Sequence, residues 1–451
     1  MAVRLGGLAS SLVCGGCGAR VPPEEPYPFR CPRAGDGGDH VLQRVLDHSR
    51  VSFPSPGSSE PEPFVRYRRM LHSYHLALAG GMSDEAYVDM VRELDGAVVG
   101  VDGRGFAVTP LTTEAALSEA LGLSHLLLVK DETGNVSGSH KGRHLFGLLL
   151  NLEVAERIGL VNRAERRPLA IASCGNAALA AAVVAAAGGR ELRVFVPTDA
   201  DESVVRRLEE LGASVTVCER EPGRTGDPTY HRLQQAIAEG AVPFTCQGNE
   251  NGLAIEGGET LGYEIASSVS ARSQPLDAVV VQVGGGALAS AVAASFQEAA
   301  ELEALAQVPR LYTLQTESAF PLKRAFDRIV EEAETHGGAE SVEPVLHEAA
   351  RHRSEYMWAW ESAPHSIAHG ILDDETYDWL AVCKAMLATG GAPAVVGEEE
   401  LAKANSLAVE KTGIPVDPTG SSGLAGLVKL LDDGHIHRNE RVAILFTGVQ
   451  R

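Results

Sequence analysis

Short apolar runs alternate with helix-like stretches along most of this chain of 451 residues. The runs cover residues 126–129, 169–172, 194–197, 214–217, 278–283, 311–315 and 442–446. Each run has the length of a buried strand and is too short for a typical helix. Because strands that alternate with helices usually pair in parallel, the pattern predicts an α/β fold with a mainly parallel sheet.

Charge and hydropathy exclude several classes of partner. The chain has 60 acidic residues and 39 Lys and Arg, so its net charge of −21 repels nucleic acids and anionic membrane surfaces. The most apolar run, residues 177–187, is shorter than the roughly 20 residues that cross a bilayer, and we interpret it as a buried helix. We therefore expect no nucleic-acid and no membrane partner.

The start of the sequence and its cysteines indicate a compartment. Cys14 and a Gly-Gly pair follow residues 1–13 at the point where a signal peptide would place its cleavage site. Four further cysteines are scattered too widely for the disulfide framework of a secreted domain: Cys174, Cys218, Cys246 and Cys383. We expect a cytoplasmic protein.

A polar loop at residues 130–143 joins one apolar run to an apolar helix that begins near Leu145. Its sequence is KDETGNVSGSHKGR, with Lys141 directly after His140. A lysine on a loop is usually a solvated surface charge, so this loop identifies no site by itself.

Three further loops lie beside predicted strands or helices. The sequence Ser173-Cys-Gly-Asn176 places backbone amides at the N-terminus of the alanine-rich helix, where anions bind. The sequence Gly284-Gly-Gly-Ala287 also precedes a helix, and its glycines let backbone N–H groups approach a phosphate closely. A short loop near the end of the sequence presents the hydroxyl of Thr419. Each motif alone is equally compatible with a helix cap or a tight turn.

In this order and spacing, the four motifs resemble those of the fold-type II pyridoxal 5′-phosphate (PLP) enzymes, the tryptophan synthase β-subunit class. Within the class the chain is most similar to threonine synthase-like proteins, and segments 244–264, 311–317 and 442–448 extend the similarity over most of the chain. The resemblance implies two open, twisted, mainly parallel sheets with flanking helices. It also implies a large PLP-binding domain (residues 46–125 with 271–451) and a small α/β domain (126–270).

The resemblance also implies a role for each motif. Lys141 would carry PLP as a Schiff base and act as general base, with Lys130 or Arg143 as a cationic neighbour that helps to keep its amine uncharged. Asn176 would contact the 3′-oxygen of the cofactor ring, and Thr419 would face the pyridine nitrogen. The remaining assignments are the phosphate loop (Gly284, Gly285, Gly286 and Ala287) and a substrate-binding loop (Ser173, Gly175 and Asn176).

Two departures from threonine synthases concern the substrate and the cofactor. Ala177, Ala178 and Ala187 stand where those enzymes place hydroxyl residues and an arginine that would bind a substrate phosphate. Each missing charge-assisted donor is worth about 1.5–3 kcal/mol, so we expect an unphosphorylated substrate. His140 stands where many relatives have Phe; it either contacts the cofactor phosphate or fills space, and we include it among the cofactor-binding residues.

The first 45 residues form a segment of their own, with Cys14-Gly-Gly-Cys17 and Cys31. This arrangement is similar to the zinc-ribbon-like start of many threonine synthase-like proteins. Tetrahedral zinc needs four ligands, and His40 is the nearest candidate for the fourth. The segment either holds a structural zinc ion or carries reduced thiols in a ribbon that has lost its metal.

From the resemblance we predict a PLP-dependent lyase or transferase that acts as a homodimer. It would remove the α-proton of a small amino acid and carry out β- or γ-elimination or replacement. The alternatives are a serine/threonine dehydratase and a catalytically silent PLP-binding regulatory protein. The acidic stretch at residues 329–352 is expected to be a surface insertion.

Overall fold

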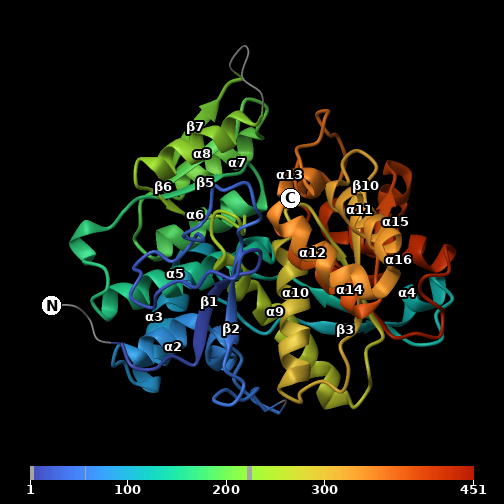
Figure 1. The fold of residues 1–451 in the computed structure, drawn as a ribbon, viewed down its shortest axis with the longest axis horizontal. Coiled ribbons are helices and arrows are strands. Elements are labelled where there is room, and N and C mark those ends of the chain that lie inside the picture. Colours follow the sequence, from blue (N-terminus) through green and yellow to red (C-terminus); the bar gives the residue numbers. More distant parts are fainter. Residues whose placement is uncertain (1–4, 56, 221–225) are drawn as a thin grey trace.

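The computed structural model describes residues 5–55, 57–220 and 226–451, and Figure 1 shows its ribbon. Residues 1–4 of the expected N-terminal segment lie outside these ranges. None of the helices within them combines the length and the apolar character needed to span a bilayer.

The larger of the two main sheets has six strands in the order β11-β10-β9-β12-β4-β3. All neighbours pair in parallel except β3, which is antiparallel to β4 at one edge. Every residue of the central strands β9 and β12 is buried, as expected for strands that are covered on both faces. The strands are β3 (Leu111–Glu114), β4 (Leu127–Asp131), β9 (Ala278–Gln282), β10 (Arg310–Thr316), β11 (Pro393–Val396) and β12 (Val442–Phe446).

The smaller sheet has four parallel strands in the order β7-β6-β5-β8 and lies at the upper left of Figure 1. Its strands are β5 (Leu169–Ala172), β6 (Leu192–Pro197), β7 (Ser214–Cys218) and β8 (Val242–Pro243). Two mainly parallel sheets confirm the predicted fold class.

Helices cover the sheets on both sides. One core packs α2, α3, α5 and α6 with the small sheet, and two further cores pack α9–α14 and α4, α15 and α16 with the large sheet. The helices are α1 (Pro63–Arg66), α2 (His72–Ala79), α3 (Asp84–Asp102), α4 (Ala115–Ala120), α5 (Lys141–Arg157), α6 (Asn176–Ala187), α7 (Glu202–Glu210), α8 (Pro228–Ala238), α9 (Ala254–Arg272), α10 (Ala287–Glu301), α11 (Pro321–His336), α12 (Val342–Arg351), α13 (Arg353–Tyr356), α14 (Trp379–Thr389), α15 (Glu398–Thr412) and α16 (Pro418–Asp432).

The N-terminal segment contains an antiparallel hairpin of β1 (Ser10–Cys14) and β2 (Leu42–Leu46). Arg44 of β2 is buried and forms ion pairs with three glutamates of α9 and α10: Glu256, Glu259 and Glu298. These ion pairs, together with the hydrogen bond from the Gly252 N–H to the Phe29 carbonyl at 3.0 Å, attach the hairpin to the body of the protein.

Two sequence-based expectations differ from the structure. The strand at the start of the expected small domain is β4, which pairs with β12 in the large sheet. The interpretation of residues 329–352 as a surface insertion is wrong, because Ile329, Val345 and Leu346 of α11 and α12 are buried in a core of the large sheet. Their acidic neighbours hid the apolar face of these helices.

Candidate active site

The carboxyl ends of strands from both sheets meet at one cavity of about 310 Å³. Residues that follow β5, β8, β9 and β12 line it, for example Ser173, Thr245, Gly284 and Thr447, together with Pro197 at the end of β6. In open α/β sheets, ligands bind in the crevice outside the carboxyl ends of the strands. The topology therefore places the candidate site here.

All four sequence motifs line this cavity. Lys141 is the first residue of α5, Asn176 is the first residue of α6, and Thr419 lies in the first turn of α16. Together with the glycine loop, they belong to the same lining. Side chains that are up to 278 residues apart in sequence, from Lys141 to Thr419, thus face one another.

The loop before α6 offers backbone donors. Ser173 and Gly175 line the cavity beside Asn176, and no side chain caps the helix at Gly175. The first N–H groups of a helix have no partner within the helix and attract anions. The side-chain oxygen of Asn176 accepts a hydrogen bond from Arg451. The loop can therefore bind a carboxylate through its backbone.

The glycine loop, Gly284 to Ala287, joins β9 to the 15-residue helix α10. Gly286 has a φ of 97°, which an L-residue rarely adopts. A Cβ atom at Gly284 would clash with the Asp373 carboxylate, and one at Gly285 would lie 2.9 Å from the Tyr377 ring. Larger residues are thus excluded at the loop, which leaves its N–H groups accessible to a bound group.

The Thr419 hydroxyl is held in place by the backbone N–H of Gly370, which donates to its oxygen at 3.1 Å. This contact uses a lone pair and leaves the hydroxyl proton free to donate. Thr419 can therefore offer one hydrogen bond to an acceptor in the cavity.

His140 lines the cavity next to Lys141 and is buried. Burial, with the nearby positive charge of Lys141, lowers the pKa of His140 well below its usual value, so the ring is neutral. Its Nδ1 lies 3.3 Å from the Thr447 carbonyl, and Nε2 has no hydrogen-bond partner. If Nδ1 carries the proton and donates to this carbonyl, Nε2 is left as an acceptor. Such a ring can accept a hydrogen bond from a donor in the cavity, but it has no N–H to offer a phosphate.

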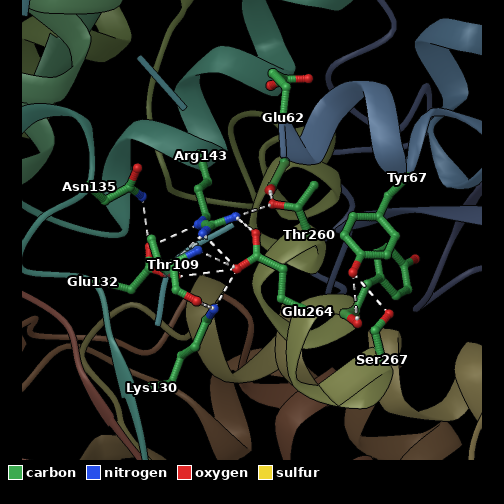
Figure 2. A network of polar contacts seen from close by, with 12 residues as sticks. Glu62, Tyr67, Thr109, Lys130, Glu132, Asn135, Arg143, Thr260, Glu264 and Ser267 are labelled. Atoms are coloured by element: carbon green, nitrogen blue, oxygen red, sulfur yellow. Dashed lines mark hydrogen bonds and ion pairs between the residues drawn. The ribbon is translucent and has the colours of Figure 1, made fainter. Parts of the chain in front are cut away.

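The sequence suggested that Lys130 or Arg143 is a cationic neighbour of Lys141. Neither residue lines the cavity. Both are fully buried in the network of Figure 2, where Lys130 pairs with Glu264, and Arg143 pairs with Glu132 and Glu264. Their charges are thus balanced by carboxylates. Because Arg143 lies in the first turn of α5, the network anchors the turn that carries Lys141.

Segment 369–378 was not predicted from the sequence to belong to the site. His369, Asp373 and Tyr377 of this segment line the cavity. The segment follows no predicted strand, so the rule that located the other motifs could not find it. His369 and the aromatic residues around Tyr377 were the available signal, but from the sequence packing was the better explanation of them.

Of the three alanines that differ from threonine synthases, only one lines the cavity. Ala177 lines it, whereas Ala178 is buried in the core and Ala187 ends α6, about three turns away. Ala177 is therefore the departure that bears on ligand binding. Among the lining residues Lys141 is the one lysine, and no arginine is present.

A second cluster joins Cys14, Cys17, Cys31 and His40, whose potential ligand atoms all lie within 4.8 Å of one another. The Cys17 and Cys31 sulfurs are 3.6 Å apart, and Cys14 Sγ lies 3.6 Å from His40 Nδ1. Ligands about 2.3 Å from a tetrahedral zinc ion are roughly 3.7 Å apart. The other ring nitrogen of His40 contacts the Asp36 carboxylate at 2.6 Å, as is usual for a metal-bound histidine.

The chain is similar to known PLP-dependent enzymes. A family model described as "Pyridoxal-phosphate dependent enzyme" matches residues 104–448. Threonine synthase from Methanocaldococcus jannaschii is 26% identical over 343 residues, which cover 75% of this chain and 74% of that protein.

Solved structures share the fold. The processed form of threonine deaminase isoform 2 from Solanum lycopersicum has a TM-score of 0.56 at 17% identity and covers 82% of this chain and 92% of its own. Maize serine racemase has a TM-score of 0.57 at 18% identity, with coverage of 81% and 93%. At this level of identity, the likeness concerns the fold alone.

Proposed function

The chain belongs to the family of pyridoxal-phosphate dependent enzymes, and from this we propose that the cavity is its active site, with Lys141 as the cofactor-binding and catalytic residue. The observation that carries the proposal is the convergence of Lys141, Asn176, the glycine loop and Thr419 on one cavity. The membership and the threonine synthase relatives identify a PLP-dependent lyase or synthase of fold type II.

The donor set fits PLP. Lys141 offers a primary amine for the cofactor aldehyde, and the glycine loop at the start of α10 offers backbone donors for the phosphate. We assign Asn176 to the 3′-oxygen of the ring and Thr419 to its pyridine nitrogen, because both residues line the cavity. The cavity of about 310 Å³ lies at the lower end of the usual range for small-molecule sites.

When bound, PLP supplies an electron sink that stabilises negative charge at the α-carbon of an amino acid. The Ser173 hydroxyl and the N–H groups of Gly175 and Asn176 bind the α-carboxylate and orient the α-hydrogen toward Lys141, whereas the N–H of Ser173 itself donates to the Phe195 carbonyl. The amine of Lys141 then takes this proton and can return it to the substrate or to a leaving group. Thr419 donates a hydrogen bond without adding a negative charge, which favours elimination and replacement over transamination.

The preferred substrate is an unphosphorylated amino acid with a leaving group at the β- or γ-carbon. The cavity lining lacks arginine, and its acidic residues Asp227 and Asp373 would repel a substrate phosphate. Elimination from serine or threonine and replacement at a homoserine ester all fit this description.

The proposal is tested by adding PLP to the purified chain and recording its visible absorbance. Borohydride reduction should then leave the cofactor on the tryptic peptide that contains Lys141. Incubation with serine, threonine, cysteine and homoserine esters should yield 2-oxo acids or new amino acids. A chain that binds no PLP would overturn the proposal, and a labelled chain that is inert with every donor and acceptor would favour the regulatory alternative.

The Thr419 hydroxyl provides a sharper test of the geometry. Thr419→Val keeps the size of the side chain but removes its donor, so we expect turnover to fall roughly tenfold to a hundredfold. Thr419→Ser retains the hydroxyl and should stay within a few-fold of the parent protein. Equal activity of the two variants, measured as turnover of the best substrate, would remove Thr419 from the site.

We also propose that Cys14, Cys17, Cys31 and His40 bind a structural zinc ion. The four potential ligand atoms and the Asp36 contact support this assignment.

Chelation should release about one zinc ion per chain and lower the melting temperature, because the metal links residues 14–40 across a segment with a small core of its own. Cys17→Ser should reproduce the shift, whereas Cys383→Ser, in the core of the large domain, should leave the zinc content unchanged. A metal-free chain with an unaltered melting curve contradicts the proposal.

We further propose a cytoplasmic homodimer with the domain boundaries given above, except that β4 belongs to the large domain. No cysteine in the described residues forms a disulfide, which supports a reducing compartment. Sedimentation velocity will decide the oligomeric state.

A further inference from the structure

Residues 369–378, which we name the covering segment, lie against the glycine loop. The Thr376 hydroxyl donates to the Gly284 carbonyl at 3.0 Å, and the Asp378 N–H donates to the Gly285 carbonyl at 3.0 Å. Both bonds use loop carbonyls and leave the loop N–H groups for another partner. The covering segment therefore fixes the loop without blocking its anion-binding side.

One side chain of the covering segment faces that anion-binding side. The Asp373 carboxylate lies so close to Gly284 that a Cβ atom there would clash with it, and the backbone N–H of Gly285 is directed at it. Asp373 also lines the cavity with Lys141. The protein thus presents its own anion to the loop that would bind the cofactor phosphate.

We propose that Asp373 competes with the cofactor phosphate for the glycine loop and thereby limits the affinity for PLP. The inference rests on the proposed function, because it takes the loop as the phosphate site. A phosphate and a carboxylate cannot accept a hydrogen bond from the same N–H at the same time. A phosphate at the loop would also be repelled by the negative charge of Asp373. Binding of PLP must therefore displace the Asp373 carboxylate or find it protonated.

Charges from several elements act on Asp373. Burial raises the pKa of Asp373 to about 6, while Lys141 of α5 and the Gly285 N–H oppose this rise. Asp374 of the covering segment and Asp227 at the start of α8 add to it. Cys246 and Tyr377, on whose pKa values Asp373 acts, are buried and neutral near pH 6, since burial raises the pKa of each.

The pH dependence follows from this pKa. Above pH 6 Asp373 is a carboxylate that competes for the loop, whereas below pH 6 it is neutral and can donate a hydrogen bond to phosphate. Its inhibitory effect therefore grows as the pH rises through about 6. The ionisation of the free PLP phosphate also affects binding, but it is the same for two variants that are compared at the same pH.

The test compares Asp373→Asn with the parent chain and with Asp374→Asn, which removes the same charge one residue away and outside the cavity lining. The dissociation constant of PLP is measured by absorbance titration between pH 5 and 8. We expect Asp373→Asn to bind PLP roughly tenfold more tightly at pH 7.5 and about equally at pH 5, and Asp374→Asn to change little. Weaker binding by Asp373→Asn, or equal changes in both variants, would overturn the proposal.

Inorganic phosphate separates this inference from the proposed function. If none of the three chains binds PLP, the proposed function fails, yet the loop can still be tested by phosphate titration with calorimetry. Tighter phosphate binding by Asp373→Asn than by Asp374→Asn supports competition at the loop, and equal or weaker binding refutes it.

Discussion

Lys141→Ala should lower the rate of α-proton exchange by at least about a thousandfold, because a positioned general base is worth a factor of roughly 10² to 10⁴ and the covalent anchor is lost as well. Exchange of the substrate α-hydrogen with deuterated water, followed by NMR, measures this step for any bound amino acid. The measurement requires no knowledge of the leaving group or the nucleophile.

Two controls distinguish lost chemistry from lost structure. Small primary amines added to Lys141→Ala should restore part of the exchange, since they can enter the cavity and take the proton. In the reduced parent protein, the cofactor should be found on Lys141 and not on Lys130, whose amine donates to the Thr109 carbonyl at 2.7 Å and pairs with Glu264. Exchange at the parental rate in Lys141→Ala would contradict its role as the base.

Local sequence patterns were sufficient to locate the central strands and to find the four motifs that line the cavity. Strands such as β9 and β12 are continuous apolar runs because both of their faces are buried, and the loops after them hold Gly284 and Thr447. The carboxyl ends of parallel strands converge, so order along the chain was enough to anticipate which loops share the cavity.

Long-range pairing could not be read from the sequence in the same way. The apolar run of β4 does not reveal that its partners are β12 and β3, and this pairing is what places the strand in the large sheet. Asp373 reaches the glycine loop from a segment without a regular pattern. For Lys130 and Arg143 the residue types were noticed, but Glu264, the carboxylate that pairs with both, lies on α9 more than 120 residues away.

The buried network of Figure 2 should make Arg143→Met one of the most destabilising single changes in the protein. The Arg143 guanidinium donates to Glu132 at 2.8 Å and to Glu264 at 2.6 Å, with all three side chains fully buried. In its absence Lys130, which pairs with Glu264, is the one cation that the network of Figure 2 retains for two buried carboxylates. We expect the free energy of unfolding to fall by about 3–5 kcal/mol, the usual cost of leaving a buried charge unpaired.

Arg157→Met is the matched control, because Arg157 lies on the same helix and pairs with Glu93 at 2.7 Å on the surface. Solvent screens that pair, so its loss should cost no more than about 1 kcal/mol. Urea unfolding of both variants gives the comparison, and Thr260→Val, which removes one hydrogen-bond partner of Arg143, provides a milder change if Arg143→Met does not fold.

Because Arg143 anchors the turn that carries Lys141, its loss should also weaken PLP binding under conditions where the variant is folded. Equal unfolding free energies for Arg143→Met and Arg157→Met would show that the network neither stabilises the fold nor anchors the catalytic turn.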